Sequence, residues 1–378
     1  MKFEIDTATL QRVVKVLGVV ARVNVIDSTG RLLMETDKDN IVFTVNNGAT
    51  DITISTPALS ISEPGKLSIV YGKIKSFVSS YKPWNGTSGV KKFRINSTEK
   101  STFIKVDNFY GDGKAAKSSL KLVNSNPALL QKSASFENTT FILNSTVFRT
   151  ATNKVLYAID PSMDFSLMAL QGMNMSFDGN DIYFVGANGK VLSECQIKNT
   201  GEYNECNITL QYDFIMGLRR LLRDDIQLFW EIKGNRILVK FDDIVYSGRH
   251  IVGHEYPVYK NSFDDYTSYI NFNKELLLET VRPFVDVLEP EDNFRLTFEV
   301  KDKMIKLFNE QGSVELEQDI QGGIDYTIDI NGKFFIQTVE SINDTNIILK
   351  FSDENGLLIF DASTTNDQKS LIMPLSKR

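Results

Sequence analysis

The residue types that most often carry chemistry are sparse in this chain. His250 and His254 are its only histidines, and their H-x-x-x-H spacing would place two metal ligands on one face of a helix. They flank Gly253 in a segment that is typical of a strand end and a turn, so the spacing does not build a metal site there. Cys195 and Cys206, the only cysteines, are too far apart for a C-x-x-C pair. We therefore expect no metal, no disulfide and two buried thiols.

The sequence also lacks the motifs of the common catalytic sites. It contains no serine nucleophile elbow, no phosphate-binding Walker loop and no dinucleotide fingerprint. Asp-Asp pairs begin at positions 224, 242 and 264, in contexts that favour turns and caps over acid–base dyads. We expect a protein that is not an enzyme and uses no cofactor.

Composition bounds the class of protein. The chain has 378 residues, of which 42% are hydrophobic and 24% charged, enough for two or three domains with substantial cores. No stretch approaches the roughly 18 uncharged apolar residues of a membrane span, and the first residues lack the apolar centre of a signal peptide. We expect a cytoplasmic protein with no membrane partner. The net charge of −6 argues, by itself, against binding to nucleic acid.

A strand followed directly by an amphipathic helix recurs six times along the chain. Each copy shows alternating apolar residues and then apolar residues three or four positions apart. In the first copy, Asp6 or Thr7 is the expected N-cap, and Pro83 ends the second helix. The six expected helices span residues 7–20, 72–82, 145–157, 212–223, 273–288 and 331–342.

Pairs of these copies predict domains of similar size. The polar segments 124–135 and 260–268 are the expected linkers, which divides the chain into residues 1–130, 131–262 and 263–378. Each domain should contain two helices packed on antiparallel sheets, an α+β architecture. The alternative is an array of β-sandwiches with occasional helices, but sandwiches do not predict a helix after every opening strand.

Positive charge is concentrated on the six expected helices. They hold thirteen basic and five acidic residues, a net charge of +8, so the rest of the chain carries −14. This separation is expected if the helices share one face that meets phosphates while the sheets form an acidic exterior. Binding would then depend on charge and not on base sequence. The alternative is that the helices simply have solvated basic faces, and the fifth and sixth helices, at −1 and 0, favour it.

Several local sequences then indicate a family. The chain starts with MKFEI, ends with SLIMPLSKR at 370–378, and contains LMALQGMNMSF at 167–177, FVGANGKVLSE at 184–194 and IVYSGRHIVGHEYPVYKN at 244–261. In order and spacing, these segments resemble the bacterial type of DNA sliding clamp, the β subunit of the replicative DNA polymerase holoenzyme. The resemblance covers the whole chain, with departures such as Tyr256 in place of the phenylalanine before Pro257. It indicates a divergent lineage and leaves bacterial and phage origins open.

The resemblance implies a DNA clamp fold of three repeated domains that closes head to tail, as a homodimer, into a ring around double-stranded DNA. It implies a processivity factor of DNA replication that tethers the DNA polymerase and meets the clamp loader through short linear peptides. The DNA-facing residues would be Arg12, Lys15, Arg22, Lys73, Lys75, Lys82, Arg149, Lys154, Arg219, Arg220 and Arg223.

Two further sites follow from the same resemblance. Phe103 would face Val287 and Leu288 across the subunit interface, although Lys105 stands where the family tends to be apolar. The partner-peptide groove would be lined by Leu170, Ala187, Gly189, Leu192, Pro257, Leu371, Met373, Pro374 and Leu375. An ordinary hydrophobic core explains these apolar residues just as simply, and without the resemblance it would be the preferred explanation. A clamp-fold decoy or interaction protein that no longer closes a ring remains the alternative function.

Overall fold

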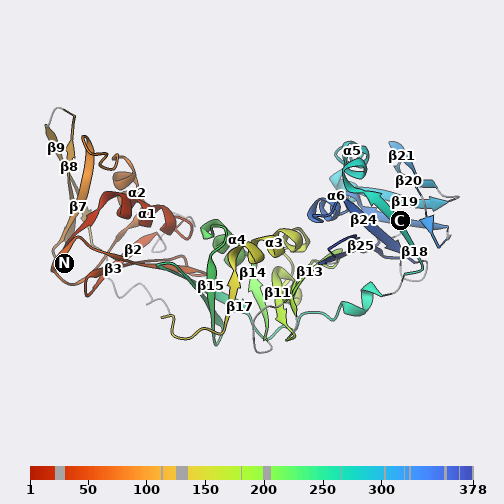
Figure 1. The fold of residues 1–378 in the computed structure, drawn as a ribbon, viewed down its shortest axis with the longest axis horizontal. Helices are drawn as coiled ribbons and strands as arrows, with labels where there is room; N and C mark the ends of the chain where they lie inside the picture. The colour runs from red at the N-terminus through yellow and green to blue at the C-terminus, as the bar shows by residue number, and fades with distance from the viewer. Residues whose placement is uncertain are drawn as a thin grey trace. The chain divides into compact units, whose positions relative to one another are not determined.

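The computed structural model describes residues 1–21, 30–111, 114–124, 135–179, 181–198, 206–264, 266–301, 304–318, 320–322, 325–352, 356–365 and 367–376. The chain divides into two compact units, Met1–Ser145 with Asp213–Arg249, and Thr146–Tyr212 with His250–Arg378 (Figure 1). The division into three domains stays a prediction, and most of the expected linker 124–135 lies outside the described residues. None of the described helices is long and apolar enough to cross a membrane.

The six predicted helices are confirmed. They are α1 (Thr7–Leu17), α2 (Tyr71–Ser79), α3 (Ser145–Val155), α4 (Tyr212–Leu221), α5 (Lys274–Val285) and α6 (Gly332–Ser341). Each follows a strand without a break, namely β1 (Lys2–Asp6), β6 (Lys66–Val70), β10 (Phe141–Asn144), β14 (Cys206–Gln211), β18 (Ser268–Asn273) and β23 (Tyr326–Asn331). Of the two expected caps, Asp6 is the N-cap of α1, and its carboxylate accepts a hydrogen bond from the Thr9 backbone N–H at 3.0 Å.

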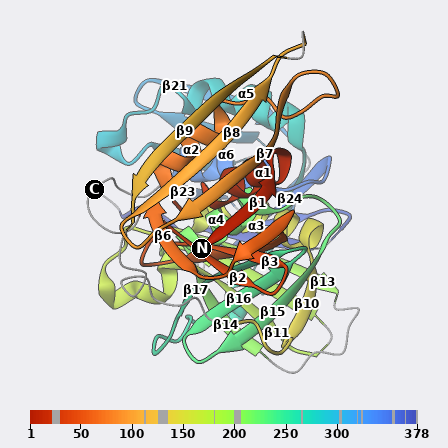
Figure 2. The same ribbon diagram turned by 90° about the vertical axis from the view of Figure 1, so that its left-hand side faces the viewer.

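The first unit contains two antiparallel sheets. One has the order β5-β1-β7-β8-β9, with β5 (Ser60–Glu63), β7 (Gly89–Ser97), β8 (Ser101–Phe109) and β9 (Ala115–Val123). In Figure 2, β7, β8 and β9 run side by side. The order of the other is β6-β2-β3-β4-β17-β16-β15-β10, with β2 (Arg31–Asp37), β3 (Asn40–Asn46), β4 (Asp51–Pro57), β15 (Gln227–Lys233), β16 (Arg236–Phe241) and β17 (Ile244–Ile251).

The second unit also contains two antiparallel sheets. The order of the larger is β14-β11-β12-β13-β26-β25-β24-β18, with β11 (Gly172–Phe177), β12 (Asp181–Ala187), β13 (Val191–Lys198), β24 (Asn346–Phe351), β25 (Leu358–Ala362) and β26 (Gln368–Ile372). The short β22 (Ile320–Gln321) also pairs with β18. The smaller sheet has the order β21-β20-β19-β23, with β19 (Arg295–Lys301), β20 (Met304–Asn309) and β21 (Gly312–Glu317).

Close packing of α4 on β17 fixes one side of the candidate site. The rings of Phe214 and Tyr246 stack with centroids 4.9 Å apart, and both side chains are buried. A Cβ added to Gly217 would lie 2.2 Å from Tyr246 Oη, and one added to Gly248 would lie 2.5 Å from the Phe214 ring. Only glycine allows the helix and the strand to approach this closely.

Candidate functional site

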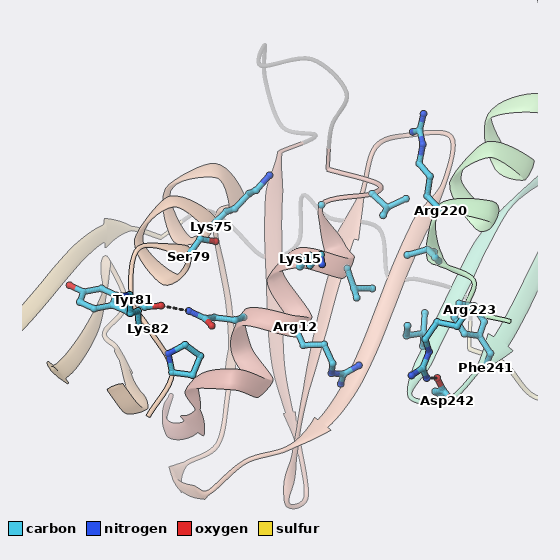
Figure 3. Close-up of a pocket in the computed structure, with 17 residues that line it drawn as sticks. Arg12, Lys15, Lys75, Ser79, Tyr81, Lys82, Arg220, Arg223, Phe241 and Asp242 are labelled. Atoms are coloured by element: carbon cyan, nitrogen blue, oxygen red, sulfur yellow. Dashed lines mark hydrogen bonds and ion pairs between the residues drawn. The ribbon is translucent and has the colours of Figure 1, made fainter. Parts of the chain in front are cut away.

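A cavity of about 930 Å³ opens in the first unit between the helix pair α1–α2 and the C-terminal end of α4 (Figure 3). We call it the cation pocket. Its lining includes Arg12 and Lys15 from α1 and Lys75 from α2. Lys82 follows α2, and Arg220 lies in the last turn of α4. The full lining is Gln11, Arg12, Lys15, Val16, Gly18, Val19, Lys75, Ser79, Tyr81, Lys82, Pro83, Arg220, Leu221, Arg223, Phe241, Asp242 and Ile244.

Six basic side chains and one acidic side chain line this pocket. Four of the six, Lys15, Lys75, Lys82 and Arg220, are exposed and form no ion pair with any described carboxylate. This excess of positive charge in one pocket attracts anions. Of the basic residues predicted to share one face, these four line one pocket together without an ion pair to a described carboxylate.

The other two cations of the pocket are held by the turn between β16 and β17. Arg12 Nη1 lies 3.0 Å from Asp243 Oδ1, and Arg223 Nη2 lies 2.5 Å from Asp242 Oδ2. The hydrogen bond to Asp243 raises the pKa of Arg12 above its ordinary value, so the guanidinium stays charged. Both arginines therefore already have anionic partners.

Hydrogen bonds between α1 and α2 hold the basic helices together. The amide of Gln11 donates to the backbone carbonyls of Val78, at 2.9 Å, and Tyr81, at 2.6 Å. The hydroxyl of Tyr71 donates to the carbonyl of Val14 at 2.6 Å in the buried contact between the helices. These bonds join α1 to α2, so Lys15 and Lys75 extend from two helices that are linked to each other.

The remaining predicted DNA-facing residues are dispersed. Lys73 is exposed on α2 outside the pocket lining. Arg219 is half-buried beside the Met216 sulfur, and Arg149 is half-buried on α3 in the second unit. Arg22 lies outside the described residues.

The surroundings of Lys154 contradict its sequence-based assignment to the DNA-facing residues. Its side chain is only 3% exposed, and its Nζ lies 2.6 Å from Asp367 Oδ2. Its own backbone carbonyl accepts a hydrogen bond from Ser193 Oγ at 2.8 Å. A lysine that is buried and paired in this way has no surface to offer to a phosphate, so the prediction that Lys154 faces DNA is wrong.

The predicted groove residues gather in the second unit. Leu170, Ala187, Leu192 and Leu371 belong to one apolar cluster and are 5–8% exposed. The strand register explains their meeting, because Leu192 on β13 pairs with Ala187 on β12 and with Leu371 on β26. Val185, Phe263 and Ile359 complete the cluster. We call it the apolar cluster.

Two turns border the apolar cluster with more exposed residues. Gly189 has a φ of +76° in the β12–β13 turn, a conformation that favours glycine. Met373 follows β26, is 42% exposed, and its backbone N–H donates to the Lys190 carbonyl at 2.8 Å. Pro374 and Pro257 are also exposed, and Leu375 is half-buried. The described structure therefore combines a nearly buried floor with an exposed methionine and prolines.

A polar group lies beside this floor. Glu194, two residues after Leu192 on β13, accepts a hydrogen bond from the Tyr259 hydroxyl at 2.6 Å. Burial raises the pKa of Glu194 above that of an ordinary glutamate, although the Tyr259 hydrogen bond opposes the shift. Tyr256 and Tyr259 pack on the apolar cluster from segment 252–263. The contact between Glu194 and Tyr259 could not be predicted from the sequence, because it depends on how segment 252–263 crosses the sheet.

The predicted interface residues have different surroundings. Phe103 is half-buried on β8, with Lys121 Nζ 5.7 Å from its ring centroid. Val287 is 59% exposed. Leu288 is 5% exposed and belongs to the core of the second unit, so its assignment to a subunit interface is corrected to a core position.

Solved structures of similar fold span the whole chain. The DNA polymerase III subunit beta of Pseudomonas aeruginosa superposes with a TM-score of 0.87 at 15% identity, covering 100% of both chains. The DNA polymerase sliding clamp of Bacillus subtilis gives 0.86 at 15% identity, and the beta subunit of Streptococcus pyogenes DNA polymerase gives 0.83 at 16%, each with 100% of both chains covered. The chain has the sliding-clamp fold. No protein-family model and no curated protein sequence matches it.

Within the clamp fold, two features of the site escaped the sequence analysis. The sequence predicts that Asp242 and Asp243 are plain turn residues, whereas in the structure each pairs with an arginine. The pairing of β17 with β4 places Asp243 in the unit that holds Arg12. The edge strands β9 and β21 were not singled out either. The contacts of the Asp242–Asp243 turn and the edge positions of β9 and β21 both depend on which strands pair across long stretches of sequence.

Proposed function

We propose that the protein is a DNA sliding clamp, a non-enzymatic processivity factor of three repeated domains that encircles double-stranded DNA as a head-to-tail homodimer. The observation that carries this proposal is the cation pocket, with Lys15, Lys75, Lys82 and Arg220 unpaired among the described carboxylates, in a chain with the clamp fold. Such a protein would act in DNA replication, in the cytoplasm.

The chemistry of the pocket fits the phosphate backbone of DNA. Lysine and arginine side chains bind phosphates and release counter-ions, which gives affinity without base readout and makes it sensitive to salt. Four unpaired cations from three helical segments are a modest set, so contact with DNA would be weak enough for movement along the duplex. A topological link, and not tight binding, would then hold the protein on DNA.

Ring closure is supported by two strands that end their sheets among the described residues. β9 carries Lys117 and Lys121, and β21 carries Glu315 and Glu317. Both strands are largely exposed, and an open strand edge is a ready template for another strand. We propose that β9 of one subunit pairs with β21 of the other, with opposite charges facing each other and with Phe103 and Val287 nearby.

The apolar cluster supports the second half of the proposal, a groove that accepts short linear peptides of the DNA polymerase and clamp loader. Met373 offers an exposed, adaptable side chain at its border, and Pro257 and Pro374 stiffen the backbone there. The floor of Leu170, Leu192 and Leu371 offers little open surface, so a bound peptide would have to settle over it and move the border residues.

Substitution of Met373 tests the groove. Because Met373 is 42% exposed, Met373→Ala should leave the fold intact and weaken binding of labelled apolar peptides from replicative polymerases by about tenfold, the loss typical of one anchor residue. Fluorescence anisotropy measures this loss. Met304→Ala, at a methionine 37% exposed on β20, is the matched control and should bind as the unsubstituted protein does. Equal affinity of the two variants would contradict the groove assignment.

A further inference from the structure

Two neighbouring carboxylates engage the otherwise basic cation pocket, because Asp242 lines it and Asp243 pairs with the lining residue Arg12. Neither carboxylate is explained by the proposed DNA contact. Asp242 and Asp243 form the turn between β16 and β17. They pair with Arg223 and Arg12, from the segments that follow or form α4 and α1. Figure 3 shows Arg223 beside Asp242, and the Arg12 side chain extending from α1 toward them. One third of the basic residues that line the pocket are thus neutralised by the protein itself.

The position of this acidic turn is fixed by the sheet. Phe241 and Ile244 pair across the turn, and Ile244 pairs with Ile54 on β4. The Ser55 backbone N–H donates to the Asp243 carbonyl at 3.1 Å. Asp242 adopts a φ of +47°, which makes the hairpin tight. Strand pairing on both sides of the turn therefore fixes the position of the two carboxylates.

Both ion pairs are open to exchange with solvent ions. The side chains of Arg12 and Asp243 are 45% and 27% exposed, and those of Arg223 and Asp242 are 74% and 44% exposed. Exposed pairs of this kind are weak and are screened by salt. Two oxygens of a phosphate group can accept hydrogen bonds from one guanidinium, as the two oxygens of a carboxylate can, so a phosphate can take the place of either aspartate.

We propose that the Asp242–Asp243 turn is a built-in competitor of DNA phosphate, occupying Arg12 and Arg223 so that the protein holds duplex DNA less tightly than its basic residues allow. This inference rests on the proposed function. It assigns the turn a role in sliding, because a phosphate must displace a carboxylate before it gains either arginine. Among the basic residues that line the cation pocket, Lys15, Lys75, Lys82 and Arg220 then contact phosphates without this competition.

The double variant Asp242→Asn with Asp243→Asn tests the proposal. Asparagine keeps the shape of aspartate and tolerates positive φ, so the hairpin should form as before. Affinity for a labelled linear DNA duplex is measured over a series of salt concentrations. The variant should bind more tightly, and the slope of log K against log salt should steepen by up to about 1.8, since each added phosphate contact contributes about 0.9.

A second double variant controls for net charge. Asp37→Asn with Asp39→Asn makes the same change of charge in the β2–β3 turn of the same unit, where neither side chain lines the cation pocket. It should keep the slope of the unsubstituted protein. Thermal unfolding of both variants checks that they fold equally well.

The outcomes separate the inference from the function on which it rests. If the unsubstituted protein binds in a salt-dependent manner and both double variants share its slope, the competitor role is refuted and the clamp proposal stands. Weaker binding by the Asp242/Asp243 variant would also refute the competitor role, because the carboxylates would then orient the arginines for DNA. If the unsubstituted protein shows no salt-dependent binding even at low salt, the competitor role is refuted, while retention on circular DNA still tests the clamp proposal.

Discussion

Lys154 and Arg220 show how much the surroundings of a basic residue decide its role. Both were expected to face DNA, and both lie on amphipathic helices. Arg220 is exposed in the cation pocket, whereas the Lys154 side chain is 3% exposed and paired with Asp367. Sequence periodicity identifies the helix but not the residue that a neighbouring strand will cover, so charge counting overestimated the DNA-facing set.

This difference predicts opposite effects of the same substitution. Lys154→Gln should lower the free energy of unfolding by about 1–3 kcal/mol, because it removes a charge-assisted bond from a buried position. Arg220→Gln should leave stability unchanged and weaken salt-dependent binding to duplex DNA. Chemical denaturation and a DNA titration of both variants check this. The assignment fails if Lys154→Gln weakens DNA binding at full stability.

Glu194 predicts a pH dependence of stability. Burial raises its pKa in the folded protein, so the folded state binds this proton more tightly than the unfolded state does. The contribution of Glu194 to stability is therefore largest at low pH and is lost as pH rises from about 4.3, the ordinary glutamate value, through the raised folded value.

Glu194→Gln should consequently gain stability relative to the unsubstituted protein as pH rises through this range. Tyr259 keeps an acceptor in the amide oxygen, so the loop contact survives. Denaturant unfolding at several pH values measures the difference. Glu255→Gln, at an exposed carboxylate in segment 252–263, should show no such trend, and a parallel trend in both variants would contradict the assigned cause.

At the scale of elements, every strand–helix pair predicted from the sequence is present, with ends shifted by a few residues. Local signals explain this success, since alternation, helical spacing and the Asp6 cap act within short segments. The pairings of β4 with β17 and of β13 with β26 were not predictable in the same way. They join segments far apart in the chain, and they bring Asp243 to Arg12 and Leu371 to Leu192.

The close contact between α4 and β17 predicts that the stability of the fold depends strongly on Gly217. Gly217→Ala places a methyl group 2.2 Å from the Tyr246 hydroxyl, which is buried and donates to the Phe214 carbonyl at 3.2 Å. The added methyl and the buried Tyr246 side chain would occupy the same space. We therefore expect the free energy of unfolding to fall by about 1–3 kcal/mol from overpacking.

Gly72→Ala is the matched control, because no atom lies within 4 Å of the added methyl on exposed α2. It should be neutral or slightly stabilising, as alanine is a better helix former than glycine. Thermal unfolding of both variants compares them. Equal stability would contradict the close contact of α4 with β17.

At the scale of the whole molecule, the proposed clamp uses three features together: a basic pocket, two oppositely charged strand edges and an apolar cluster. Each part is weak alone. Four unpaired cations give modest affinity, and the edges of β9 and β21 close nothing within one chain. These features can hold the protein on DNA only if copies of the chain form a ring. Ring formation also distinguishes a clamp from a clamp-fold decoy.

Retention on circular DNA tests whether copies of the chain close into a ring. The protein is assembled on a nicked circular plasmid with a clamp loader and passed over a sizing column in moderate salt, before and after the circle is cut at one site. The account predicts that the protein stays with the circle and is lost from the cut, linear molecule, because only a closed ring is trapped by topology. Equal retention on both forms, or none on either, would contradict it.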